Sequence, residues 1–182
     1  MRSVGAICLL MVMAIPVSHA RAQTMTKTSS GAWTVQTGRD VTSGQVCEAV
    51  AIDPRRQASF GIRGFYDGQT ILSSTAPGLK RFDDRHVELA FVSRHDTVWH
   101  GAATGRGDEL LVRLPWQDAR AMLAKLESGD RIEVALAGDQ GPGISVPTDG
   151  LGEALARVQS CMWNTVSSAD RLRTGNTYTP LP

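Results

Sequence analysis

Short runs of alternating apolar and polar residues, separated by turn-forming residues, constrain the fold of this chain most strongly. Val87, Leu89 and Phe91 alternate with more polar neighbours, and the same period of two recurs over residues 110–114 and 132–136. Because successive side chains of a strand point to opposite faces, this period predicts β-strands. Pairs such as Asp-Pro, Asp-Gly and Pro-Gly separate the runs. The pattern predicts a mainly β protein, an antiparallel β-sandwich or flattened barrel.

Two segments show helical spacing instead, and they predict a short helix over residues 116–127 and a C-terminal helix over residues 149–161. In both, apolar residues recur three and four positions apart, which places them on one helix face. Pro115 stands at the start of the first helix, and Gly129 is placed to end it. The two apolar faces consist of Trp116, Ala119, Leu123 and Leu126, and of Leu151, Ala154, Leu155 and Val158.

The first 22 residues have the pattern of a secretory signal peptide. Arg2 precedes an apolar run from Val4 to Val17, and Ala20-Arg21-Ala22 supplies small residues at the positions that a signal peptidase reads. The alternative is an uncleaved membrane anchor, but the run is shorter than the roughly 20 residues that a spanning helix needs. We therefore expect cleavage before Gln23, a periplasmic or secreted protein, and no membrane-spanning segment after cleavage.

The remaining chain is long enough for one domain with a core of its own. We expect a flexible leader at residues 23–31, a single β-rich domain at 32–163 and a mobile polar tail at 164–182. Because Arg2 and Arg21 belong to the signal segment, 17 of the 19 basic residues remain against 18 acidic ones, a formal charge of −1. This balance gives no electrostatic reason to expect a nucleic acid or an anionic membrane as the partner.

Cys47 and Cys161 are the two cysteines that remain after cleavage, because Cys8 lies in the signal segment. An even number in an oxidising compartment predicts a disulfide, and two cysteines allow one intramolecular pairing. Cys161 follows Ala154 by seven residues, so it lies on the buried stripe of the predicted C-terminal helix. The alternatives are two free thiols or an intermolecular bridge.

Three segments, taken in order, resemble a known family. They are Gly31-Ala32-Trp33-Thr34-Val35, then Cys47-Glu48-Ala49, and finally residues 144–161 with Ala154-Leu155, Val158 and Cys161. This order is similar to that of the small exported proteobacterial proteins of the invasion-associated locus B type. The resemblance implies an exported, β-rich protein associated with a host or with the envelope, and it implies no defined chemistry.

The histidines provide the one candidate for catalysis or metal binding. His86, His95 and His100 cluster in the sequence, and Glu88 shares a predicted strand face with His86. Zinc binds imidazole and carboxylate groups that converge on it. Two such residues on one strand face are also common on a solvated surface. The cluster therefore supports only an alternative function, an envelope hydrolase or metal-dependent enzyme that uses the His86–His100 region.

Other signatures of catalysis are absent from the sequence. It has no Gly-x-Ser-x-Gly motif, and the predicted disulfide leaves no free thiol for a cysteine nucleophile. We expect no cofactor. Trp99 and Trp163 are the better candidates for a surface aromatic contact, since Trp33 and Trp116 fall on predicted buried faces. The sequence thus favours a non-enzymatic binding protein whose partner is another protein or an envelope component.

Overall fold

The computed structural model describes residues 25–40, 44–94, 96–136 and 143–174, and these form a ten-stranded antiparallel sheet with two α-helices and one 3₁₀ helix. The elements are β1 (Met25–Ser30), β2 (Trp33–Asp40), β3 (Gly44–Asp53), β4 (Ala58–Gly64), β5 (Gln69–Thr75), η1 (Leu79–Phe82), β6 (His86–Ser93), β7 (Asp96–Arg106), β8 (Glu109–Pro115), α1 (Trp116–Glu127), β9 (Arg131–Leu136), β10 (Ile144–Pro147) and α2 (Leu151–Thr174).

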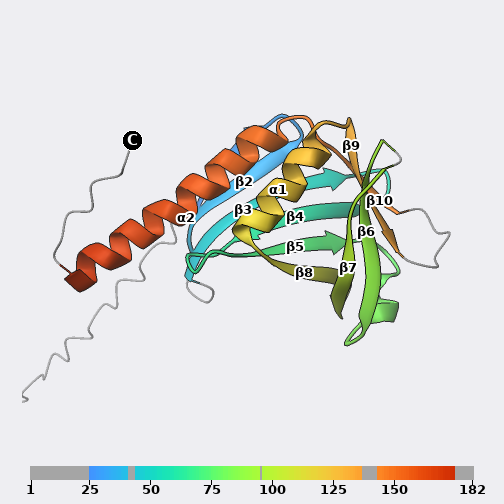
Figure 1. Cartoon of the computed structure of the whole chain (residues 1–182), viewed down its shortest axis with the longest axis horizontal. Helices are drawn as coiled ribbons and strands as arrows, with labels where there is room; N and C mark the ends of the chain where they lie inside the picture. The colour runs from blue at the N-terminus through green and yellow to red at the C-terminus, as the bar shows by residue number, and fades with distance from the viewer. Residues whose placement is uncertain (1–24, 41–43, 95, 137–142, 175–182) are drawn as a thin grey trace, which may run out of the picture.

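The sheet has the strand order β1-β2-β3-β4-β5-β8-β7-β6-β9-β10, and it bends where β8 passes to β7 (Figure 1). β7 pairs with β8 only through residues 104–106, so the two parts of the sheet diverge beyond that point. The bend brings β10, at one end of the order, against β3 and β4. The expected antiparallel β-rich fold with a short helix and a C-terminal helix is therefore confirmed. The sheet folds over itself like a sandwich and does not close into a barrel.

The two helices cover the inner face of the sheet. Figure 1 shows α2 lying across β2 and β3, with α1 beside it. Phe60 on β4 contacts Phe91 on β6 edge to face, with ring centroids 5.5 Å apart, and so joins the two parts of the folded sheet. Burial of such side chains is the main favourable contribution to folding. The largest fully buried side chains include Trp33, Phe60, Phe91, Ile62, Leu72, Leu89, Leu110, Leu123, Leu126, Ile132 and Leu151.

The start of α2 is fixed to the β1–β2 turn by a close approach of two backbones. The Ala32 N–H donates to the Asp149 carbonyl oxygen over 3.0 Å. A Cβ on Gly150 would lie 2.0 Å from the Ser30 carbonyl oxygen, and the φ of Gly150 is +81°. Only glycine adopts this positive φ readily and also lacks the Cβ for which there is no room. The β1–β2 turn and the start of α2 are therefore held together at this point.

Two of the expected segment boundaries need correction. Residues 25–30, expected to belong to a flexible leader, form β1, which pairs with β2 from Met25↔Gly38 to Ser30↔Trp33. An edge strand obtains its stability from backbone hydrogen bonds to one neighbour, and it can carry polar threonine and serine on its exposed face. The predicted signal peptide at residues 1–22, residues 23–24 and residues 175–182 lie outside the described residues.

The C-terminal helix is also longer than expected. α2 continues to Thr174, through much of the segment that was expected to be a mobile tail. Residues 163–174 contain neither proline nor glycine, and Gly175 is the first residue that readily ends a helix. The apolar periodicity ends near Cys161, but the helix does not, since a polar segment without proline or glycine can prolong a helix that packing has already nucleated.

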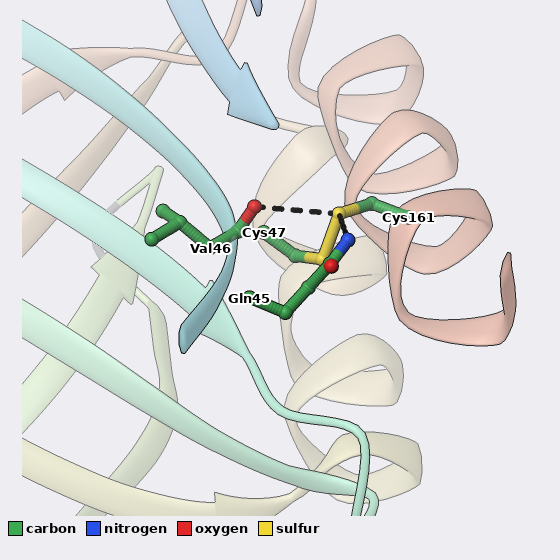
Figure 2. The surroundings of a disulfide bond; sticks show 4 residues. All are labelled: Gln45, Val46, Cys47 and Cys161. Carbon is green, nitrogen blue, oxygen red and sulfur yellow. Dashed lines mark hydrogen bonds between the residues drawn. A yellow bond between two sulfur atoms is a disulfide. The ribbon is translucent and has the colours of Figure 1, made fainter. Parts of the chain in front are cut away.

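Cys47 on β3 and Cys161 on α2 are joined in a disulfide, with their Cα atoms 5.7 Å apart (Figure 2). The Gln45 side-chain amide donates to Cys161 Sγ over 3.6 Å. Cys161 Sγ also lies 3.4 Å from the Val46 carbonyl oxygen; an oxidised sulfur carries no hydrogen, so this is a contact and not a donated hydrogen bond. The bond attaches α2 covalently to the strand beneath it.

Candidate functional site

An aromatic groove lies where the β4–β5 turn, the β8–α1 junction and α2 meet. Its cavity has a volume of about 320 Å³. We define the aromatic groove by the residues that line it: Tyr66, Asp67, Gly68, Gln69, Pro115, Trp116, Gln117, Met162 and Trp163. These residues come from three separate parts of the chain, so the groove exists only in the folded protein.

The turn that carries Tyr66 has a defined geometry. Asp67 Oδ1 accepts a hydrogen bond of 2.9 Å from the Gln69 N–H, and the Gly68 N–H donates to the Phe65 carbonyl oxygen over 3.1 Å. Gly68 has a φ of +81°, which is why the Asp-Gly pair of the sequence suits this position. The Trp116 N–H donates to the Gly68 carbonyl oxygen over 2.8 Å and so attaches the start of α1 to the turn.

The opposite wall of the groove is held by the packing of α2. Met162 and Trp163 directly follow the disulfide residue Cys161. Met162 is buried against Gly64 at the end of β4, where a Cβ would lie 2.2 Å from the methionine sulfur. Cys47 pairs with Gly64 in the β3–β4 register, so the covalent bond and this close contact lie side by side. The wall is therefore fixed both covalently and by packing.

The three aromatic side chains of the groove differ in exposure. Tyr66 is 69% exposed and Trp163 is 59% exposed, whereas Trp116 is 7% exposed and forms the floor. Among the described residues, Ile52 is the other large hydrophobic side chain with comparable exposure. Exposing two large aromatic rings around one hollow leaves apolar surface in water, and such clusters mark interaction sites. Asp67 is the one charged residue in the groove lining.

The two tryptophans expected at the surface lie in different environments. Trp163 is exposed and lines the aromatic groove. Trp99 is partly buried and packs against the core, with its ring centroid 5.2 Å from that of Phe91. Gly101 leaves the space that the indole occupies, since a Cβ there would lie 2.7 Å from the ring. Trp99 thus contributes to the core side of β7.

The candidate metal-ligating residues do not converge. His86 Nδ1 lies 3.2 Å from Thr104 Oγ1 on the neighbouring strand. His100 pairs with Ala90, four positions along β6 from His86, which corresponds to about 13 Å at a rise of about 3.3 Å per residue. Glu88 is exposed on the outer face of β6, and His95 lies outside the described residues. The described part of the chain contains no group of three or more metal-ligating side chains.

Tyr66 and Trp116 are groove residues that sequence reasoning did not select. Trp116 is buried, as its place on the apolar helix face indicated. Its position in the groove lining depends on the pairing of β5 with β8, which places Gln69 opposite Pro115. Tyr66 precedes the Asp67-Gly68 turn signal, and a large aromatic residue beside a tight turn is a usable indication of an exposed ring.

No described helix has both the length and the apolar character needed to cross a membrane.

Comparison with known proteins gives a relationship at the level of fold. No family model matches the chain, and no curated protein matches its sequence. Among solved structures, the crystal structure of invasion associated protein B from Bartonella henselae matches with a TM-score of 0.52 and 14% sequence identity, over 74% of this chain and 96% of that chain. The chain therefore shares its fold with invasion associated protein B, in agreement with the resemblance noted in the sequence.

Proposed function

We propose that this chain is an exported, non-enzymatic binding protein, and that its aromatic groove binds a segment of another protein. The observation that carries the proposal is the pair of exposed rings, Tyr66 and Trp163, that line one groove together with the buried Trp116. Tyrosine, tryptophan and methionine are enriched at protein interfaces, and tyrosine and tryptophan are among the residues that carry most of the binding energy. Rings on a fixed support also lose little conformational freedom on binding.

The groove favours a particular kind of partner. A volume of about 320 Å³ accommodates a few side chains and not a whole domain surface. Its lining is aromatic and apolar, with two glutamines and Asp67 as the polar groups. An extended segment that presents a proline or another apolar side chain, with a basic residue near Asp67, fits this chemistry.

The lining also favours binding over catalysis. Asp67 is the one acidic or basic side chain among the lining residues, and its Oδ1 accepts the Gln69 N–H of the turn. A nucleophilic side chain is activated by a base within hydrogen-bonding reach, and the lining residues include no serine, threonine, cysteine or lysine that Asp67 could activate. The disulfide supports an exported location, because such bonds persist in oxidising compartments.

Site-specific photocrosslinking tests the proposal. A photoreactive phenylalanine analogue at Gln117, an exposed groove residue, should give a discrete protein adduct in cells that express the full chain. The same analogue at Glu88, exposed on the outer face of β6, is the matched control and should not give that adduct. Mass spectrometry of the adduct identifies the partner.

The double variant Tyr66→Ala/Trp163→Ala then tests the role of the aromatic rings. Because both side chains are mostly exposed, we expect the melting temperature to change little. Truncating an interface hot spot costs about 2 kcal/mol, or roughly a 30-fold weaker Kd for the identified partner. An adduct that forms equally from Glu88, or that persists undiminished in the double variant, would count against the groove as the binding site.

A further inference from the structure

A second unusual surface lies at the opposite end of β4. The turn between β3 and β4 carries Arg55 and Arg56, and β9 places Arg131 beside it, around a hollow of about 410 Å³. We call this the arginine turn and define it by the residues that line the hollow: Ile52, Asp53, Pro54, Arg55, Arg56, Arg131, Ser145 and Pro147.

Positive charge is in excess at the arginine turn. The Asp53 carboxylate is shared, since Oδ2 lies 4.0 Å from Arg56 Nε and 3.7 Å from Arg131 Nη2. Its other oxygen accepts the Arg55 backbone N–H over 3.1 Å. Within the described residues, no ion pair joins the Arg55 side chain to an acidic group. Three guanidinium groups therefore face one carboxylate among the lining residues, a local charge of +2.

Two of the three arginines are held in place by neutral acceptors. Arg131 donates from Nε to Ser145 Oγ and from Nη2 to the Ser145 carbonyl oxygen, both over 2.7 Å. Arg56 donates from Nη1 to the Gly143 carbonyl oxygen over 2.8 Å. Their side chains remain 47% and 50% exposed. Each guanidinium has five N–H donors, so both keep donors for an anion that approaches from solvent.

An exposed aliphatic side chain accompanies this charge. Ile52, the residue before Asp53 at the end of β3, is 61% exposed and lines the same hollow. Basic groups that surround an exposed aliphatic group suit a surface that offers phosphates at its boundary and hydrocarbon beneath. An inorganic anion would use only the arginines, whereas a lipid surface would use both the arginines and Ile52.

We propose that the arginine turn binds the anionic surface of a phospholipid bilayer, with Arg55, Arg56 and Arg131 at the lipid phosphates and Ile52 inserted between headgroups. The topology gives this docking a defined orientation. The arginine turn precedes the seven residues of β4 and the aromatic groove follows them, a separation of about 23 Å at a rise of about 3.3 Å per residue. A chain attached by its arginine turn presents the aromatic groove away from the bilayer.

Vesicle flotation with the full mature chain tests this proposal. We expect the protein to float with phosphatidylcholine vesicles that contain phosphatidylglycerol and not with pure phosphatidylcholine vesicles, and added salt should weaken the binding. The variant Arg55→Gln/Arg56→Gln should bind at least tenfold more weakly, and Ile52→Ser should show a smaller loss. Arg113→Gln/Arg120→Gln, which removes two exposed arginines of β8 and α1, is the matched control and should bind as the wild type does.

Several results would overturn the proposal. They are equal binding to both kinds of vesicle, an equal loss in the control variant, or no vesicle binding by the wild type. If the protein bound inorganic phosphate but not phosphatidylglycerol vesicles, the arginine turn would be a site for a free anion. If it bound polyglutamate but not these vesicles, the partner would be an acidic protein. Melting curves of each variant separate these results from misfolding. Because the aromatic groove uses different residues, its crosslinks should form whether or not vesicles bind.

Discussion

The two ends of β4 carry turns that are held by different forces. At the groove end, the turn at residues 65–68 is fixed by backbone hydrogen bonds, by the packing of Met162 on Gly64 and by the nearby disulfide. At the other end, the turn at residues 54–57 is held by the Arg56 guanidinium, which contacts the Asp53 carboxylate and the Gly143 carbonyl oxygen, and by the Arg55 N–H, which donates to Asp53. Packing and covalent bonds respond little to salt, whereas exposed ion pairs weaken in it.

This difference matches the two proposed roles. A groove that recognises a particular segment gains from a fixed shape, because less ordering is left to occur on binding. A surface that meets lipid phosphates gains from exposed charge, and exposed charge contributes little to folding. Changes at the groove end should therefore affect stability most, and changes in surface charge should affect it least.

Removal of the disulfide should have the largest effect. Cys161→Ser opens a bond that closes a sequence separation of 114 residues, and the chain-entropy model gives up to about 4.7 kcal/mol for a loop of that order. We expect the free energy of unfolding to fall by about 3 to 4 kcal/mol, as measured by urea denaturation under oxidising conditions. The double variant Cys47→Ser/Cys161→Ser should lose the same amount. Unchanged stability would show that packing alone holds α2.

The contact between Gly64 and Met162 should produce the next largest effect. Gly64→Ala places a methyl group where the methionine sulfur now lies, and overpacking of this kind costs about 1–3 kcal/mol. In Gly64→Ala/Met162→Ala the new methyl group occupies space that the methionine has left. The double variant should therefore lose less stability than the two single variants added together. Additive losses in urea denaturation would show that the two residues do not compete for space.

Asp53→Asn tests the arginine turn. It removes the negative charge that Arg56 and Arg131 share. Because both arginines are about half exposed, we expect a loss of about 1 kcal/mol in the free energy of unfolding, and the loss should shrink at high salt. Binding to phosphatidylglycerol vesicles should strengthen, since the local charge rises. A loss that salt does not reduce would mean that the turn depends on hydrogen bonds and not on charge.

Elements with a local sequence repeat show where sequence reasoning succeeds. Period-two alternation identified β6, β8 and β9, and the helical spacing of Trp116, Leu123 and Leu126 identified α1 with its observed bounds. The place of Cys161 on the apolar stripe of a helix indicated a pairing with Cys47, which the structure contains. The strands and α1 follow from local periodicity, and the disulfide follows because two cysteines allow only one intramolecular pairing.

The features that escaped prediction depend on contacts between distant residues. Trp163 was expected at the surface, but its grouping with Tyr66 and Trp116 was not. Trp116 follows Tyr66 by 50 residues and Trp163 follows Trp116 by 47, and β5–β8 pairing and α2 packing bring the three together. Arg131 likewise joins Arg55 and Arg56 only in the folded sheet, so a net charge of −1 gave no sign of a basic surface. β1 escaped because its polar residues do not alternate, although backbone pairing with β2 suffices to hold them.

The smallest effect on stability should come from an exposed ion pair on α2, the helix that the disulfide attaches to β3. Arg157 Nη2 lies 2.6 Å from Glu153 Oε1, one helical turn away. The hydrogen bond from Arg157 and its charge lower the pKa of Glu153 from the usual value of 4.5. A lowered pKa in the folded state stabilises the protein above the unfolded pKa, and the contribution disappears as the pH falls through the folded pKa.

We therefore expect Glu153→Gln to be slightly less stable than the wild type at pH 7, with a difference close to the error of urea denaturation. The difference should vanish as the pH is lowered below 4.5, because the wild-type carboxyl group then becomes protonated. The Glu153 side chain is exposed, so water and salt screen its attraction to Arg157. A loss comparable to that of Cys161→Ser would contradict the comparison, since it would make surface charge, and not the disulfide and packing, the main attachment of α2.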